Sequence, residues 1–256
     1  MKQHIPNIAT LLNLMSGCIA ILFVVQGELV WGAIFVCIGI VFDFLDGLLA
    51  RMLNAQSALG LQLDSLADVV TSGVVPGLIM YQLMAMSVNT SGELIYLLET
   101  NSNDATWYNT ELGFFPLIAL LIPLASAYRL GKFNLDTEQQ DFFKGLPTPA
   151  NTLLIISLPL ILEYQNNDLI NAQIVNPWVL LGITILSVYM LNAPIKLFSL
   201  KFKSFDFKSN ATRFSFLILT LVLLIVLKFA AVPVIIILYV VMSLLDNLAS
   251  RSNQSS

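Results

Sequence analysis

The sequence predicts an all-α, polytopic membrane protein, a bundle of about eight transmembrane helices in which the first six form the core. Hydrophobic residues make up 57% of the chain and charged residues only 11%, whereas an ordinary soluble domain is about 25% charged. The mean hydropathy is +0.82. Apolar runs close to the ~20 residues that span a bilayer recur along the whole chain. The expected spans are 8–26, 30–50, 66–88, 112–130, 147–163, 175–194, 211–228 and 231–248.

The first two spans are continuous apolar runs. The first has polar residues every third position, Asn7, Thr10 and Asn13, and no small-residue cleavage site. It is therefore expected to remain as a mature helix rather than to be removed as a signal peptide. Its polar stripe favours the lining of a cavity over a simple hydrogen-bonded helix seam. The second span is expected to end near Ala50.

The later spans are separated by recognisable breaks. The stretch MLNAQSALGLQ before the third span is long enough for a turn between antiparallel helices. An acidic loop, 89–111, precedes the fourth span. The fifth span is the shortest, and the sixth follows it after a polar break. Between the seventh and eighth, Lys228 and Pro233 flank a tight turn.

Positive residues set the expected orientation, because cytoplasmic loops carry an excess of lysine and arginine. With a cytoplasmic N-terminus, only Lys228 lies outside, and the 89–111 loop, which has acids and no base, faces outward. The stretch KLFSLKFKSFDFKSNATR after the sixth span is expected to be an interfacial anchor. The basic residues expected inside are Lys2, Arg51, Arg129, Lys132, Lys144, Lys196, Lys201, Lys203, Lys208, Arg213 and Arg251.

Four aspartates stand out in this apolar chain. Asp43 and Asp46 are three apart and Asp64 and Asp68 four apart, so each pair shares one face of its helix. Two such helices packed antiparallel bring the acidic faces together. A buried charge costs several kcal/mol unless it faces water or a cation. Hard divalent cations bind oxygen ligands and are often completed by substrate phosphates, so the cluster favours a Mg²⁺ or Mn²⁺ phosphoryl-transfer site. The alternative is solvated acids at helix ends.

Other sequence features agree with carboxylate chemistry. The chain has one histidine, His4, which leaves little room for a histidine triad or a histidine-rich zinc site. Gly47, Ala50 and Gly60 are small residues beside the acids, where backbone and ligand can approach closely. The alternative for these residues is a helix-packing seam.

The combined pattern resembles the signature of the CDP-alcohol phosphotransferases. It reads Asp43-x2-Asp46-Gly47-x2-Ala50-Arg51-x8-Gly60-x3-Asp64-x3-Asp68. The resemblance implies that the four aspartates hold two Mg²⁺ or Mn²⁺ ions and that Asp68 is also the catalytic base. It implies a site for the nucleotide and the CDP-linked lipid formed by Gly47, Ala50, Arg51 and Gly60, to which the first-helix stripe adds Asn7 and Thr10.

Three further stretches resemble the bacterial, integral-membrane branch of that family that uses serine: IPNIATLLNLMSGCIAI, YRLGKFN and FKGLPTPAN. This resemblance implies transfer of a phosphatidyl group from CDP-diacylglycerol to L-serine, releasing CMP. Arg129 and Lys132, together with Lys144 just before the fifth span, are expected to meet the serine carboxylate, with positive-inside anchoring as the alternative. The expected division is a catalytic bundle over 1–195, followed at 196–256 by the basic-aromatic loop and two C-terminal helices.

Two alternatives remain open at this stage. One is the same chemistry on glycerol 3-phosphate or inositol phosphate, which would favour a denser basic pocket. The other is a divalent-cation transporter, although transporters usually place such acids near the midplane between internal repeats. The expected partners are membrane lipids and a second copy of the chain in a homodimer, with no nucleic acid. The expected location is the bacterial inner membrane, with the active site facing the cytoplasm.

Overall fold

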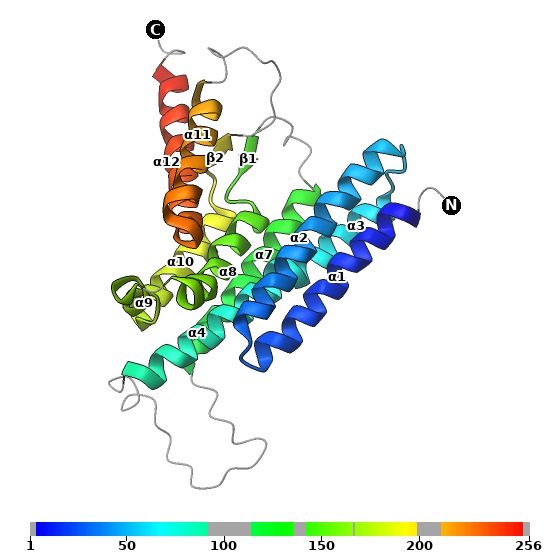
Figure 1. Ribbon diagram of the computed structural model, residues 1–256. Coiled ribbons are helices and arrows are strands. Elements are labelled where there is room, and N and C mark those ends of the chain that lie inside the picture. Colours follow the sequence, from blue (N-terminus) through cyan, green and yellow to red (C-terminus); the bar gives the residue numbers. More distant parts are fainter. Residues whose placement is uncertain (1–3, 92–113, 136–141, 166, 199–210, 253–256) are drawn as a thin grey trace.

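The computed structural model describes residues 4–91, 114–135, 142–165, 167–198 and 211–252. Over these ranges the chain is a bundle of tilted helices with an upright pair of helices at one side (Figure 1). The outward loop expected at 89–111 lies almost wholly outside the described residues. So do most of the basic-aromatic stretch and part of the 129–146 loop, so their expected orientation stays a prediction.

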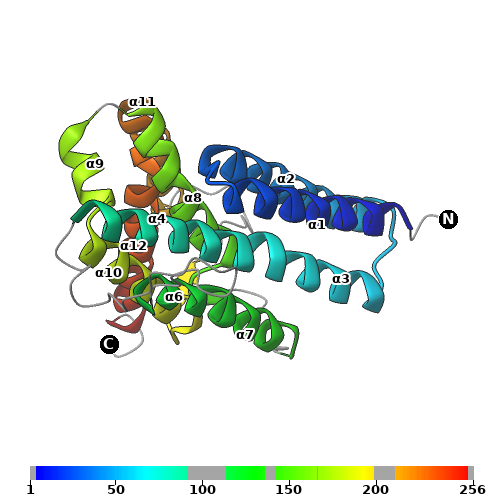
Figure 2. The same cartoon turned by 90° about the horizontal axis from the view of Figure 1, so that it is seen from below.

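The chain begins with a helical hairpin. Helix α1, His4–Val25, turns at Gly27, whose φ of 86° suits a residue without a Cβ, and α2, Leu29–Met52, returns alongside it. The two helices lie side by side along their length in both ribbon views (Figures 1 and 2). This arrangement agrees with the first two expected spans.

The third span begins earlier than expected. Helix α3, Ala58–Asp68, starts after Ser57, whose hydroxyl accepts a hydrogen bond from the Gly60 N–H at 3.0 Å. This N-cap fixes the start of the helix, so the turn after α2 is shorter than the predicted one and the boundary at 66 is wrong. The helix continues through a π-helical segment, Val69–Val74, into α4, Val75–Ser91. Together they form one long element through the middle of the bundle (Figure 2).

The next helices complete the core. The fourth expected span forms as a short helix, a 3₁₀ turn and a longer helix. The sixth, expected at 175–194, forms as one helix, and a short helix precedes it at a bend of 63°. Pro149 and Pro177 stand in the first turns of α8 and α10, where a missing N–H does no harm. The elements are α6, Phe114–Leu117; the 3₁₀ turn Ile118–Leu120; α7, Leu121–Leu135; α8, Thr148–Tyr164; α9, Asp168–Ile174; and α10, Pro177–Asn192.

Two C-terminal helices form a second hairpin. Helix α11, Ala211–Leu227, turns at the 3₁₀ segment Lys228–Ala230, where Lys228 has a φ of 51°, and α12, Ala231–Ser252, packs back against it. The tight turn predicted at Lys228 is confirmed.

A two-stranded antiparallel ribbon joins the hairpin to the core. Strand β1, Phe142–Lys144, pairs with β2, Lys196–Phe198, so that Lys144 is opposite Lys196. The ribbon was not predicted. It leaves the fold class unchanged, because it is the only sheet that the described residues form.

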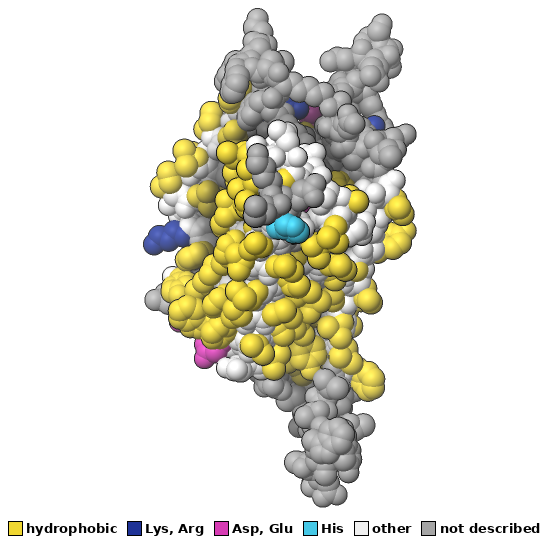
Figure 3. All heavy atoms as spheres, turned by 90° about the vertical axis from the view of Figure 1, so that its right-hand side faces the viewer, with side chains coloured by type: hydrophobic (Ala, Val, Ile, Leu, Met, Phe, Trp, Pro, Cys, Tyr) yellow, Lys and Arg dark blue, Asp and Glu magenta, His cyan; other side chains and the backbone are white. Residues whose placement is uncertain are grey.

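The surface and the core agree with a membrane-spanning bundle. Buried apolar side chains from α1, α2, α4, α8 and α10 form one continuous core. Hydrophobic side chains also form a broad area across the middle of the face shown in Figure 3. Within the described ranges, five helical stretches are long and apolar enough to cross a membrane, or six if α9 and α10 count as one bent span. One of the five, Thr212–Asn247, contains the C-terminal hairpin. The prediction of an all-α polytopic bundle is confirmed.

Candidate active site

The acidic faces of α2 and α3 meet. Within the described part of the chain, Asp43, Asp64 and Asp68 each place a carboxylate oxygen within 4.8 Å of the others. All three side chains are partly or largely buried, and Asp64 Oδ1 is buried without a hydrogen-bond partner. Three hard oxygen donors at this spacing suit a divalent cation, and an unpartnered buried oxygen is the atom that such a cation would satisfy.

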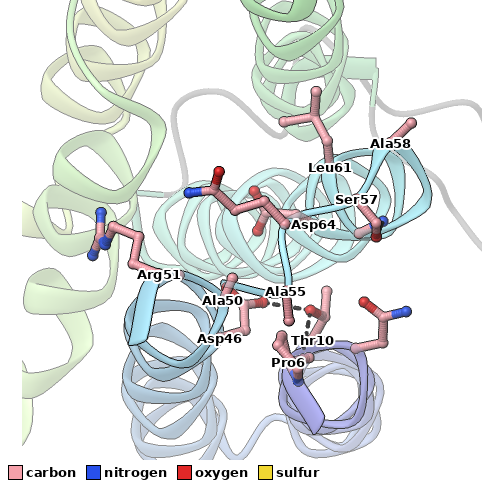
Figure 4. Close-up of a pocket in the computed structure, with 14 residues that line it drawn as sticks. Pro6, Thr10, Asp46, Ala50, Arg51, Ala55, Ser57, Ala58, Leu61 and Asp64 are labelled. Carbon is pink, nitrogen blue, oxygen red and sulfur yellow. Dashed lines mark hydrogen bonds between the residues drawn. The ribbon is translucent and has the colours of Figure 1, made fainter. Parts of the chain in front are cut away.

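Asp46 is not one of this group of three. Its Oδ2 accepts a hydrogen bond of 2.5 Å from Thr10 Oγ1, which joins α2 to α1. Thr10 also donates to the Pro6 carbonyl at 3.2 Å. Figure 4 shows Thr10 and Asp46 pointing toward each other, while the Arg51 side chain extends away from them. The metal-ligand role expected for Asp46 therefore stays a prediction.

One cavity brings together the residues expected to bind the nucleotide and the CDP-linked lipid. It has a volume of about 550 Å³ and opens between α1, the end of α2 and the start of α3. Gly60 makes room here, because a Cβ at this position would lie 3.1 Å from Asn7 Oδ1. The cavity contains all six expected residues and two of the acids: Asn7, Thr10, Gly47, Ala50, Arg51, Gly60, Asp46 and Asp64.

Asn13 links α1 to the proposed base. Its Nδ2 donates to Asp68 Oδ1 at 3.4 Å, and its carbonyl accepts from Thr71 Oγ1 at 3.3 Å. The amide is fully buried, and its Oδ1 has no partner. A Cβ at Gly39 would lie 2.9 Å from that oxygen, so only glycine lets α2 approach this closely. Asn7 and Thr10 of the stripe line the cavity, whereas Asn13 holds an acid.

A π-helical segment follows Asp68 directly. The Val75 N–H bonds the Val70 carbonyl five residues earlier, in place of the usual four. Thr71, Ser72 and Gly73 in this segment are buried, and the Ser72 carbonyl accepts from Thr152 Oγ1 of α8 at 3.0 Å. Widened helical turns of this kind are frequent at functional sites.

A second, smaller pocket is basic. Arg129 and Lys132 of α7 line a space of about 80 Å³ together with Lys144 of β1. Arg129 is only 9% exposed, and its Nε is buried without a hydrogen-bond partner. Its charge interacts with the carboxylate of Asp68. This interaction connects the basic pocket to the acid cluster.

Comparison with known proteins decides the family. The family described as CDP-alcohol phosphatidyltransferase matches residues 3–189, which contain all of the acids and the cavity. The chain belongs to this family.

Individual members of the CDP-alcohol phosphatidyltransferases are similar over about three fifths of the chain. A CDP-diacylglycerol–serine O-phosphatidyltransferase of Bacillus subtilis is 29% identical over 61% of this chain and 75% of its own length. Proteins of the same name from Mycobacterium leprae and Saccharomyces cerevisiae are 29% and 30% identical, over 61% and 60% of this chain. The match spans about half of these two proteins, 46% and 53% of their lengths.

Two polar residues of this CDP-alcohol phosphatidyltransferase were not among the predicted site residues but are partly or fully buried. Asn134 Nδ2 donates to Ser65 Oγ at 2.8 Å and thereby ties α7 to α3 beside the acids. Asn151 of α8 is fully buried, and neither of its side-chain polar atoms has a partner. The sequence signal that could have identified Asn151 is an asparagine at the end of FKGLPTPAN, at the start of an apolar helix. A buried asparagine in such a helix is costly unless a ligand or water satisfies its polar atoms.

Proposed function

We propose that this CDP-alcohol phosphatidyltransferase transfers the phosphatidyl group of CDP-diacylglycerol to L-serine and releases CMP. The observation that carries the proposal is the junction of three features: the acid cluster, the cavity of about 550 Å³ beside it, and the buried, unpartnered Arg129 Nε of the basic pocket. The names of the similar proteins support serine as the acceptor.

The donor would occupy the larger cavity. Gly47, Ala50 and Gly60 leave room for the nucleotide, and Asn7 and Thr10 supply polar contacts along one wall. Asp43, Asp64 and Asp68 would hold Mg²⁺ or Mn²⁺, with Asp46 completing a two-ion site, since carboxylate oxygens are the donors these ions prefer. When bound, the ions would neutralise the pyrophosphate and the charge that develops on it.

The acceptor would be activated by Asp68. This side chain is 9% exposed, and Asn13 orients one of its oxygens. We infer that the other oxygen removes the proton of the serine hydroxyl. The serine oxygen then bonds to the phosphorus that carries diacylglycerol, the bond from that phosphorus to CMP breaks, and CMP leaves with the electron pair. No covalent enzyme intermediate is needed.

The basic pocket would select serine. Arg129 can bind a carboxylate through two parallel hydrogen bonds, and its Nε lacks a partner in the protein. A volume of about 80 Å³ suits a small alcohol. Lys144 adds a third cation to Arg129 and Lys132, and this feature would also suit a phosphorylated alcohol. Glycerol 3-phosphate and inositol phosphate therefore belong in the acceptor test.

We also propose that the active site faces the cytoplasm of a bacterial inner membrane and that residues 1–195 form the catalytic bundle of a homodimer. The orientation can be tested at two exposed turn residues, Gln26 and Gln56, which flank α2 at opposite ends. After Cys18 and Cys37 are replaced, a cysteine at Gln56 should react only from the cytoplasmic side and one at Gln26 only from outside. The reverse labelling would contradict the orientation.

One assay tests the reaction itself. Purified protein is given CDP-diacylglycerol, Mg²⁺ or Mn²⁺, and one candidate alcohol at a time, and CMP release and the lipid product are measured. Serine should give phosphatidylserine and one CMP per lipid formed. Faster turnover with glycerol 3-phosphate or inositol phosphate would move the assignment to another alcohol, and no CMP with any alcohol would remove it.

A further inference from the structure

The C-terminal hairpin lies beyond the family match, which ends at residue 189, yet it is attached to the ribbon beside the basic pocket. Tyr239, Ser243 and Asn247 are four residues apart, so they share one face of α12. The Tyr239 hydroxyl donates to the Phe198 carbonyl at 2.8 Å, and the Phe198 N–H donates to Ser243 Oγ at 3.4 Å. Asn247 Nδ2 donates to the Lys196 carbonyl at 2.6 Å. One helix face therefore holds the main chain of β2.

Aromatic packing strengthens the same attachment. The Phe198 ring of β2 packs edge-to-face against the rings of Tyr239 of α12 and Phe216 of α11, with ring centroids 5.0 Å and 5.8 Å apart. Tyr239 and Phe216 are themselves 5.6 Å apart. Leu197, between the two hydrogen-bonded residues, is fully buried. Both helices of the hairpin thus contribute to holding β2 in place.

The ribbon carries this restraint to the basic pocket. Lys144 is paired with Lys196 across the two strands and lines the pocket. The next residues are fixed by hydrogen bonds to α10 and to the segment that follows it. The Gly145 N–H donates to the Ile195 carbonyl at 2.9 Å, and the Leu146 N–H donates to the Met190 carbonyl of α10 at 2.8 Å. Gly145 has a φ of 75°, and a Cβ there would lie 2.7 Å from the Leu191 carbonyl oxygen, so this junction has little freedom.

We propose that α12 positions the acceptor pocket. Tyr239, Ser243 and Asn247 act as positioning residues: they hold β2, β2 holds β1, and β1 places Lys144 beside Arg129. The inference rests on the proposed function in one respect, namely that the basic pocket receives the acceptor alcohol.

Kinetics test this inference through two near-isosteric variants, Tyr239→Phe and Asn247→Asp, alone and combined. Each removes one hydrogen bond, so the KM for serine should rise roughly 2- to 10-fold per variant, while the KM for CDP-diacylglycerol stays unchanged. The matched control is Thr212→Val, which removes the 3.1 Å hydrogen bond from Thr212 to Asp246 within the same hairpin and leaves the three hydrogen bonds between α12 and β2 in place. It should leave both KM values unchanged.

Hydrogen exchange provides a readout that needs no substrate. In the variants, the amides of Gly145 and Leu146 should exchange faster, by roughly the same 2- to 10-fold per lost hydrogen bond. In Thr212→Val their exchange rates should not change. Unchanged exchange and an unchanged serine KM in the combined variant would overturn the inference. So would equal losses for both substrates together with a lower unfolding temperature, because that result assigns the hairpin to folding alone. If the parent enzyme uses another alcohol, the serine assignment fails, and the inference is decided by the KM for that alcohol.

Discussion

Thr10 of α1 donates a hydrogen bond to Asp46 of α2, with 2.5 Å between Oγ1 and Oδ2, at the wall of the larger cavity. Removing the hydroxyl in Thr10→Val would leave a buried carboxylate with one partner fewer. A hydrogen bond to a charged group contributes about 1.5–3 kcal/mol, so use of CDP-diacylglycerol should fall roughly 10- to 150-fold in kcat/KM. The control is Ser16→Ala on the same helix, whose hydroxyl donates to the Leu12 carbonyl at 2.8 Å. Equal effects of both changes would remove Thr10 from the site.

Replacement of Asp68 should separate binding from turnover. Asp68→Asn keeps the shape of the side chain but cannot accept the proton of the alcohol. CMP release should fall by about 10² or more, while CDP-diacylglycerol binding remains largely intact. Asp168→Asn, an exposed acid in the first turn of α9, serves as the control and should retain activity. Near-normal turnover in Asp68→Asn would show that another group is the base.

Chelation should abolish the reaction. Carboxylates supply the ligands, so excess chelator should stop CMP release, and Mg²⁺ or Mn²⁺ should restore it. Asp64→Asn should raise the ion concentration needed for half-maximal rate, because Asp64 Oδ1 has no partner within the protein. Activity is titrated against each ion for the parent and the variant. Full turnover in chelator would exclude a metal-dependent reaction.

Substitution of Arg129 tests the choice of serine. Arg129→Ala should raise the KM for serine about 10- to 150-fold and the KM for CDP-diacylglycerol far less. Arg129→Lys should recover part of the loss, because it keeps the charge but not the bidentate fork. Ethanolamine has no carboxylate, so it should be a poor acceptor that is nearly indifferent to either change. Equal losses for serine and ethanolamine would assign Arg129 to folding or to the nucleotide.

Close packing around Asn13 should make Gly39 sensitive to a single methyl group. In Gly39→Ala the new Cβ would lie 2.7 Å from Thr71 Cγ2, and overpacking of this kind costs about 1–3 kcal/mol. The thermal midpoint in detergent should therefore fall, and activity should fall with it, because Asn13 holds Asp68. Gly182→Ala is the matched control, since among the described residues no atom outside its own stretch of helix lies within 4 Å of the added Cβ. A midpoint unchanged in Gly39→Ala would contradict the packing.

Hydropathy located the helices well but misplaced the start of the third. The first turns of α3 contain Gln62 and Asp64 and border a polar cavity, so they lack the apolar character that a hydropathy window detects. The ribbon could not be predicted for a different reason. Three-residue strands leave no periodic pattern, and β2 is held by side chains more than forty residues later in the sequence.

The candidate site was predictable as far as it is encoded in spacing. Intervals of three and four residues on two helices put the acids on facing surfaces, and the structure brings three of them together. Spacing cannot tell which acid leans toward a neighbouring helix, however. In the structure, Thr10 of α1 donates a hydrogen bond to Asp46 at the cavity wall. Asn13, one turn further along α1, donates to Asp68. Lys144 was expected beside Arg129 and Lys132, but the strand pairing that holds it at the basic pocket leaves no local pattern in the sequence.

The π-helical segment after Asp68 also sets the phase of the long helix that contains it. A segment bonded from residue i to residue i+5 holds one residue more than the α-helix would, and each residue turns an α-helix by about 100°. The extra residue therefore changes the direction in which side chains of α4 point relative to those of α3. Helix α3 directs Asp64 and Asp68 toward α2, whereas α4 directs apolar side chains into the core: Ile79, Met80 and Leu83. After deletion of one residue from 69–74, the helix could not direct both the acids of α3 toward α2 and the apolar residues of α4 into the core. A substitution in this segment leaves the rotation intact.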